Sequence, residues 1–171
     1  MSEPVQRAID SAVRRSFPLA TTFIGALAGL IAIPAPDYSQ VAPAFTLIAV
    51  YCWSIWRPDL MPLLGVFLIG LFEDVMRGLP LGVTALLLLT TAAFVQSQRG
   101  FVFGKSFDLF WVVFGLIVMG WLAVEWIALS ILLGHLLDPS AAFFRCLLTI
   151  GLLPVGAAML LAVQRIGMQE V

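Results

Sequence analysis

The side chains that could do chemistry are few in this sequence, and the first to consider is its single histidine, His135. A Ser-His-Asp or Cys-His arrangement would have to be built around it, and no Gly-x-Ser-x-Gly segment supplies a nucleophile. No group of His, Cys and carboxylate residues has the spacing of a metal site. The two cysteines, Cys52 and Cys146, lie in apolar segments, where cysteine behaves as a small hydrophobic residue. We therefore expect no catalytic residue, no bound metal and no cofactor.

A glycine-containing segment, residues 100–106, has some likeness to a phosphate-binding loop. That loop needs four residues between its first glycine and the Gly-Lys pair. Here only three residues separate Gly100 from Gly104 and Lys105. The spacing excludes a phosphate-binding loop.

Adjacent carboxylates at Glu73 and Asp74, followed by Arg77, could in principle do acid–base chemistry. Neighbouring positions on a helix diverge by about 100°, so these two carboxylates do not face each other. We expect one of them to cap a helix or pair with Arg77, while the other faces an interior crevice.

Two charged residues, Glu125 and Arg145, lie within long apolar segments. An ionisable group at the middle of a bilayer costs at least about 2.5 kcal/mol, so each needs a partner. The two can form an ion pair if their segments pack as neighbours. The alternative is a polar pocket or a contact with a partner's membrane helix, and the sequence leaves both open.

The elements that position these residues are apolar, because 61% of the 171 residues are hydrophobic and only 11% are charged. A soluble domain is about a quarter charged. The net charge of −1 provides no basic surface for nucleic acid, so the expected surroundings are a lipid bilayer. The pattern predicts an all-α integral membrane protein, a bundle of about six transmembrane helices. The apolar segments are residues 17–34, 41–56, 61–75, 81–96, 107–134 and 141–163.

The orientation of such a bundle follows from the basic residues in its connections. Only Arg77 and Arg145 fall on one side of a six-span topology, whereas seven basic residues fall on the other. We therefore expect both termini in the cytoplasm of a bacterial inner membrane. The seven residues are Arg7, Arg14, Arg15, Arg57, Arg99, Lys105 and Arg165.

The chain divides at the start of the first apolar segment. Residues 1–16 are expected to form a cytoplasmic amphipathic segment, and residues 17–171 the six-helix transmembrane domain. In the first part Val5, Ala8 and Ile9 begin an apolar stripe at helical spacing. This stripe fits a helix on the lipid surface or a docking helix for a cytoplasmic partner, and both interpretations stay open.

Three short motifs lie between residues 56 and 84: Arg57-Pro58-Asp59-Leu60-Met61-Pro62, Gly70-Leu71-Phe72-Glu73-Asp74 and Gly78-Leu79-Pro80-Leu81-Gly82. This region resembles the signature region of the MreD family of rod shape-determining proteins. The resemblance makes the motif positions candidates for partner binding, with turn formation and helix ending as the ordinary alternative. They are Arg57, Pro58, Asp59, Pro62, Gly70, Asp74, Gly78, Pro80 and Gly82.

The resemblance implies a non-enzymatic component of the bacterial cell-elongation machinery. It implies a scaffold that maintains rod shape by associating with MreC and, through it, with the MreB filament. The same assembly holds RodA and a class B penicillin-binding protein.

The resemblance also implies a fold similar to the substrate-binding subunits of energy-coupling-factor transporters. The alternative function is therefore a small-molecule-binding membrane subunit of a vitamin-type transporter. The short outer connections carry no dense polar set, which favours the scaffold.

Overall fold

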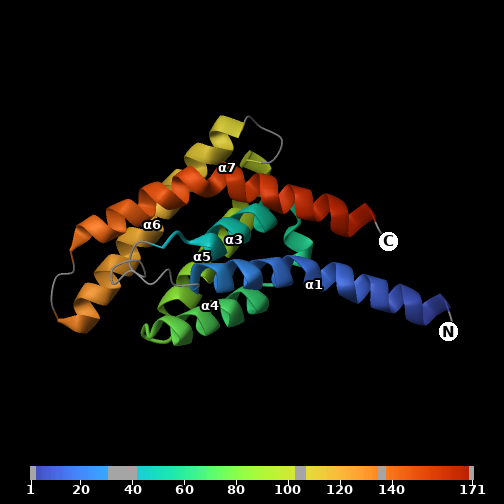
Figure 1. Ribbon diagram of the computed structural model, residues 1–171, viewed down its shortest axis with the longest axis horizontal. Coiled ribbons are helices and arrows are strands. Elements are labelled where there is room, and N and C mark those ends of the chain that lie inside the picture. Colours follow the sequence, from blue (N-terminus) through green and yellow to red (C-terminus); the bar gives the residue numbers. More distant parts are fainter. Residues whose placement is uncertain (1–2, 31–41, 103–106, 135–137, 170–171) are drawn as a thin grey trace.

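The computed structural model describes residues 3–30, 42–102, 107–134 and 138–169, and within these ranges the regular structure is entirely helical (Figure 1). A single 3₁₀ turn, η1 (Pro58–Leu60), lies between the second and third α-helices. The six α-helices in these ranges are α1 (Glu3–Leu30), α3 (Phe45–Trp56), α4 (Leu63–Arg77), α5 (Val83–Val102), α6 (Phe107–Leu133) and α7 (Pro139–Gln169).

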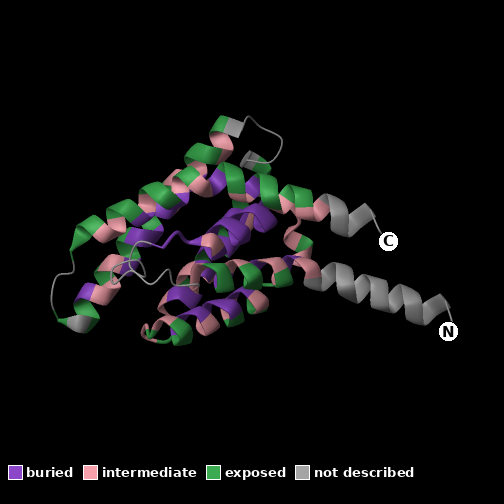
Figure 2. Cartoon of the chain, viewed as in Figure 1, coloured by how far each residue is buried: buried purple, intermediate pink, exposed green. Residues whose placement is uncertain are grey.

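Helix α3 forms the centre of the bundle and is buried at every position from Thr46 to Ile55. It packs against α1, α5 and α7, and Figure 2 shows it as the most continuously buried helix. Its Tyr51 and Trp53 are among the largest fully buried side chains, and it supplies many of the residues of the apolar core.

The other helices surround this centre, with α4 packed against α5 and α1, and α6 packed against α7 and α5. In Figure 1 the N-terminal end of α1 and the C-terminal end of α7 extend from the same end of the bundle. The turn between α4 and α5 lies at the opposite end.

Two of the described helical segments are long and apolar enough to cross a membrane, Asp108–Leu132 and Pro139–Gln164. Only 28% and 17% of their apolar windows are buried within the chain, so most of their apolar residues face outward. Such a surface requires lipid or another apolar partner to cover it. Shorter apolar helical segments occur at Phe17–Leu30, Phe45–Trp56 and Val83–Gln98.

Helix α1 runs without a break through the expected boundary between residues 16 and 17, although Pro18 lies inside it. Residues 3–16 are therefore helical and continue directly into the first apolar helix. Proline removes one backbone donor from a helix, here the donor that would bond the Arg14 carbonyl oxygen. The Pro18 carbonyl oxygen itself accepts from Thr22 Oγ1 at 2.7 Å, a side-chain bond one turn back along the helix. Residues 31–34 of the first expected span, Lys105 and His135 lie outside the described residues.

Helix α7 also contains a proline, Pro154, which cannot donate to the carbonyl of Ile150 one turn earlier. The indole Nε1 of Trp111, on α6, donates to that carbonyl oxygen at 3.0 Å.

At the start of α7, the Ser140 N–H donates to Asp138 Oδ1 at 2.9 Å and holds the pKa of the Asp138 carboxyl below its ordinary value. Asp138 is thus the N-cap of α7.

Candidate functional site: a capped helical hairpin and a buried charge cluster

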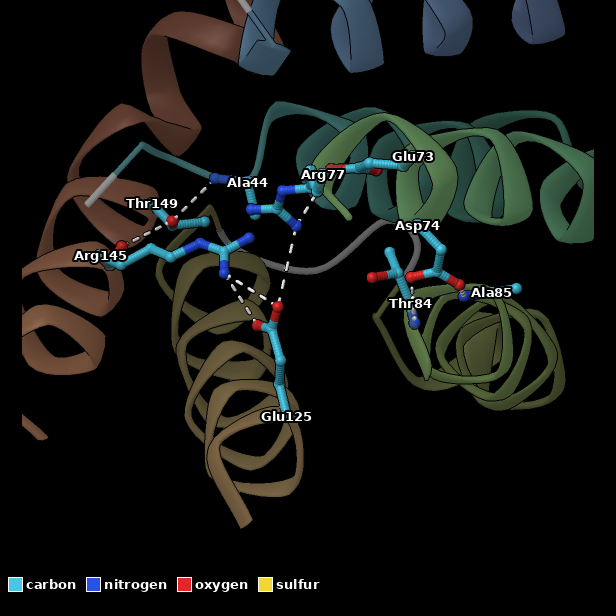
Figure 3. A network of polar contacts seen from close by, with 9 residues as sticks. All are labelled: Ala44, Glu73, Asp74, Arg77, Thr84, Ala85, Glu125, Arg145 and Thr149. Carbon is cyan, nitrogen blue, oxygen red and sulfur yellow. Dashed lines mark hydrogen bonds and ion pairs between the residues drawn. The ribbon is translucent and has the colours of Figure 1, made fainter. Parts of the chain in front are cut away.

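Asp74, in the second motif, lies fully buried near the end of α4 and accepts hydrogen bonds from the next helix. Its Oδ1 accepts from the Thr84 N–H at 3.0 Å, and its Oδ2 accepts from the Gly82 N–H at 2.9 Å and the Ala85 N–H at 3.4 Å. The first N–H groups of a helix have no partner within it. Asp74 therefore caps α5 from α4 (Figure 3).

The turn that brings Asp74 to these donors depends on glycine. Gly78 ends α4 with a φ of 65°, and the Leu79 N–H donates to the Asp74 carbonyl oxygen at 2.9 Å. Gly82, with a φ of 102°, precedes α5. A Cβ at Gly70 would lie 2.4 Å from the Ala85 Cα, so glycine lets the two helices approach. Together, these features define a tightly packed α4–α5 hairpin.

The first motif forms a separate turn at the other end of α4. Pro58 begins η1, and its carbonyl oxygen accepts from the Met61 N–H at 3.1 Å. Pro62 precedes α4 and accepts from the Gly65 N–H at 2.9 Å. The Gln96 side chain donates to the Met61 carbonyl oxygen at 3.2 Å and ties this turn to α5. Asp59, in contrast, is exposed.

A cluster of four charged side chains joins α4, α6 and α7; we call it the charge cluster, and it consists of Glu73, Arg77, Glu125 and Arg145. Arg145 Nη1 donates to Glu125 Oε1 and Oε2 at 3.1 and 2.9 Å. Arg77 Nη1 lies 3.7 Å from Glu125 Oε1 and 3.4 Å from Glu73 Oε1. Glu73, Glu125 and Arg145 are buried, and Arg77 is partly exposed. Figure 3 shows the cluster beside Asp74.

Neighbouring uncharged groups fix the position of Arg145. Thr149 Oγ1 donates to the Arg145 carbonyl oxygen at 2.7 Å and accepts from the Ala44 N–H at 3.2 Å. The Arg145 Cζ lies 5.4 Å from the centre of the Trp121 ring, a cation–π arrangement. The sequence reasoning did not include Thr149 or assign Trp121 this contact. Both lie four residues from a charged residue of the cluster, a helical spacing that could have indicated them.

The nine motif positions do not converge on one site. Gly70, Asp74, Gly78, Pro80 and Gly82 belong to the hairpin, whereas the positions from Arg57 to Pro62 form the turn before α4. Helix α4 has 15 residues and is therefore about 22 Å long, which separates the two groups. The structure does bring Glu125 and Arg145 together, and it pairs Glu73 with Arg77.

The polar side chains of the site are used for contacts between and within helices. In the described ranges, no group of three or more His, Cys, Asp or Glu side chains is arranged to hold a metal ion. Asp74 is occupied by backbone N–H groups, and both carboxylates of the charge cluster face guanidinium groups. The arrangement can hold helices together.

Comparison with known protein families identifies the family of the chain. The sequence model of the rod shape-determining protein MreD matches residues 11–162. The chain belongs to the MreD family. The match includes the three motifs, the hairpin and the charge cluster. No curated protein and no solved structure matches the chain.

Membership in the MreD family supports a role in rod shape determination. MreD proteins are membrane proteins that determine shape and are not known as enzymes. The expected likeness to transporter subunits receives no support from the solved structures.

Proposed function

We propose that the chain is a non-enzymatic scaffold that crosses the bacterial inner membrane several times and holds an MreC-like partner. Through that partner it would position MreB, RodA and a class B penicillin-binding protein for lateral growth of the cell wall. The family match and the outward-facing apolar surfaces of α6 and α7 support this proposal.

The observation that carries the proposal is how the buried charges are used. Glu125, on α6, contacts Arg145 on α7 and Arg77 on α4, so one carboxylate links three helices. Asp74 links α4 to α5. These groups rigidify a bundle and do not expose a nucleophile or a pair of facing carboxylates, which is the chemistry of a scaffold.

The proposed topology places both termini and the turn at Arg57–Pro62 in the cytoplasm. The ends of α1 and α7 emerge together, which supports this arrangement (Figure 1). Arg77 and Arg145, the two exceptions to the distribution of basic residues, belong to the charge cluster and face glutamates. Their charges are therefore matched by a counter-charge, as expected for basic groups away from the cytoplasmic side.

The partner surface is proposed to lie on the membrane-facing helices and the exposed part of the first motif. A partner's membrane helix would pack on apolar side chains, and its juxtamembrane region would meet the turn that carries the exposed Asp59. Gly70 and Asp74 would act indirectly, by keeping the hairpin in shape.

Affinity purification from native membranes in mild detergent, followed by mass spectrometry, tests the proposal. Recovery of MreC, RodA or a penicillin-binding protein supports the scaffold. Recovery of ATP-binding-cassette ATPases and a coupling subunit, without those partners, would replace it with the vitamin-type transporter. Partner recovery is then compared for two variants, Asp59→Asn and Asp74→Asn. Loss of partners in Asp59→Asn indicates a direct contact, because Asp59 is exposed, whereas loss in Asp74→Asn indicates an effect through the hairpin, because Asp74 is buried.

A further inference from the structure

The charge cluster leaves part of its hydrogen-bonding capacity unused at Arg145. Both oxygens of Glu125 accept from the same nitrogen, Nη1. The other two nitrogens, Nε and Nη2, are buried and have no hydrogen-bond partner in the part of the chain that the structure describes. Because Arg145 is only 6% exposed, bulk solvent covers almost none of these donors.

The Nε and Nη2 atoms form one complete edge of the planar guanidinium group. Two N–H donors along such an edge match two oxygens of a carboxylate or a phosphate. In Figure 3 the two atoms are turned away from Glu125, toward the side on which Arg77 and Ala44 lie. Arg145 therefore presents the geometry of a bidentate oxyanion contact.

Two more unused donors belong to side chains that contact Arg145 or share its carboxylate partner. The Trp121 ring lies beneath the Arg145 guanidinium, and its Nε1, also buried, has no acceptor among the described residues. Arg77 reaches Glu73 and Glu125 only at ion-pair distances of 3.4 and 3.7 Å, and its Nη1 forms no hydrogen bond with the described residues. Buried donors of this kind normally find acceptors. The same cluster also holds one buried acceptor without a partner among the described residues, Glu73 Oε2. Four unused donor atoms on Arg145, Trp121 and Arg77 therefore outnumber this one unused acceptor, and a further group with oxygen atoms would balance them.

The position of these donors favours phosphate. Arg77 is the last residue of α4, and Arg145 lies six residues after the start of α7, which is about 9 Å of helix. Arg77 is thus at a helix end and Arg145 within two turns of one, the part of a membrane helix nearest the phospholipid headgroups. Phe143 and Phe144, beside Arg145 in sequence, are exposed and suited to acyl chains.

We propose that Arg145, with Trp121 and Arg77, binds one phosphate-type oxyanion, carried by a phospholipid headgroup or by free phosphate. The site does not depend on the scaffolding function, because it is defined by donors within this chain.

The test uses the full chain, purified in detergent micelles, with three probes: inorganic phosphate, phosphatidylglycerol, and diacylglycerol with the same acyl chains. Thermal unfolding with increasing probe measures binding, since a ligand of the folded state raises the midpoint. Native mass spectrometry counts the retained lipids. We expect one phosphate-bearing molecule per chain and no stabilisation by diacylglycerol.

Three variants locate the contact. Trp121→Phe keeps the ring and loses the N–H donor, and Arg145→Lys keeps the charge and loses the guanidinium edge. Each is expected to weaken phosphate or lipid binding about tenfold, the loss of one good hydrogen bond. Trp111→Phe makes the same chemical change on α6 at an indole that is already bonded to Ile150, and it should bind as the parent does.

The outcomes are distinct. Stabilisation by phosphatidylglycerol alone assigns the site to a lipid headgroup, and stabilisation by inorganic phosphate assigns it to free phosphate; either supports the proposal. It is overturned if neither probe stabilises the parent, or if Trp121→Phe and Arg145→Lys both bind unchanged. Cross-linking of Arg145 to an acidic residue of a co-purified protein would also overturn the proposal, in favour of a protein contact.

Discussion

The carboxylate of Asp74, on α4, accepts the backbone N–H of Thr84, on α5, at 3.0 Å. The end of one helix thus supplies the cap of the next. The cap explains why an aspartate is useful at this position of the family motif: a short side chain with two acceptor oxygens reaches three N–H groups at once.

Replacing Asp74 by alanine should lower the free energy of unfolding by about 1–3 kcal/mol, because buried N–H donors lose their acceptor. Asp74→Asn keeps one acceptor oxygen and should lose less. Unfolding in detergent micelles measures both. The exposed Asp59 provides the matched control, since Asp59→Ala should stay within about 0.5 kcal/mol of the parent. Equal stability of Asp74→Ala and the parent would disprove the cap.

Gly70→Ala should destabilise the hairpin by about 1–3 kcal/mol, because the added methyl meets the backbone of Ala85 at 2.4 Å. The control is Gly120→Ala on α6, where an added Cβ meets nothing within 4 Å. That change should instead gain about 0.5–1 kcal/mol through helix propensity. The two thermal unfolding midpoints should therefore move in opposite directions, and a rise for Gly70→Ala would contradict the close approach.

Glu125→Gln should cost about 3–5 kcal/mol, since it leaves Arg145 buried without its counter-charge. Arg145→Met should cost less, because Arg77 still lies 3.7 Å from Glu125. The double variant should cost much less than the sum of the two, because it removes both charges together. A double-mutant cycle on unfolding measures the coupling. Simple additivity would show that the pair contributes no interaction energy. Unchanged stability of Glu125→Gln, together with normal rod shape in cells that carry it, would exclude any role for this charge.

Trp111→Phe should cost about 0.5–1.5 kcal/mol, because the Ile150 carbonyl oxygen loses the hydrogen bond from the Trp111 indole. In a Pro154→Ala background the restored backbone N–H can take over that carbonyl, so the same tryptophan change should cost less. The difference between the two backgrounds is the measurement. An equal cost in both would mean that Trp111 acts through packing alone.

The helical class, the approximate helix positions and the family were predictable from the amino-acid sequence. Long apolar segments predict helices because the backbone must satisfy its own hydrogen bonds in an apolar environment. Proline and glycine predicted the turns at Pro58 and Gly78, because each restricts or permits particular backbone angles locally. The sequence offered the Glu125–Arg145 ion pair as one of two possibilities, because charges in apolar segments need a partner, and the structure shows the ion pair.

The arrangement of the helices settles which role each polar group has. The two adjacent carboxylates have different partners: Glu73 pairs with Arg77, and Asp74 caps α5. The fold extends α1 across Pro18 and brings Trp111 to the carbonyl left free by Pro154. The contacts of Asp74 and Trp111 join positions from different helices, and their existence depends on which helices are neighbours and how they are rotated. A uniformly apolar sequence carries little information on either, because every face of its helices can be buried or face lipid equally well.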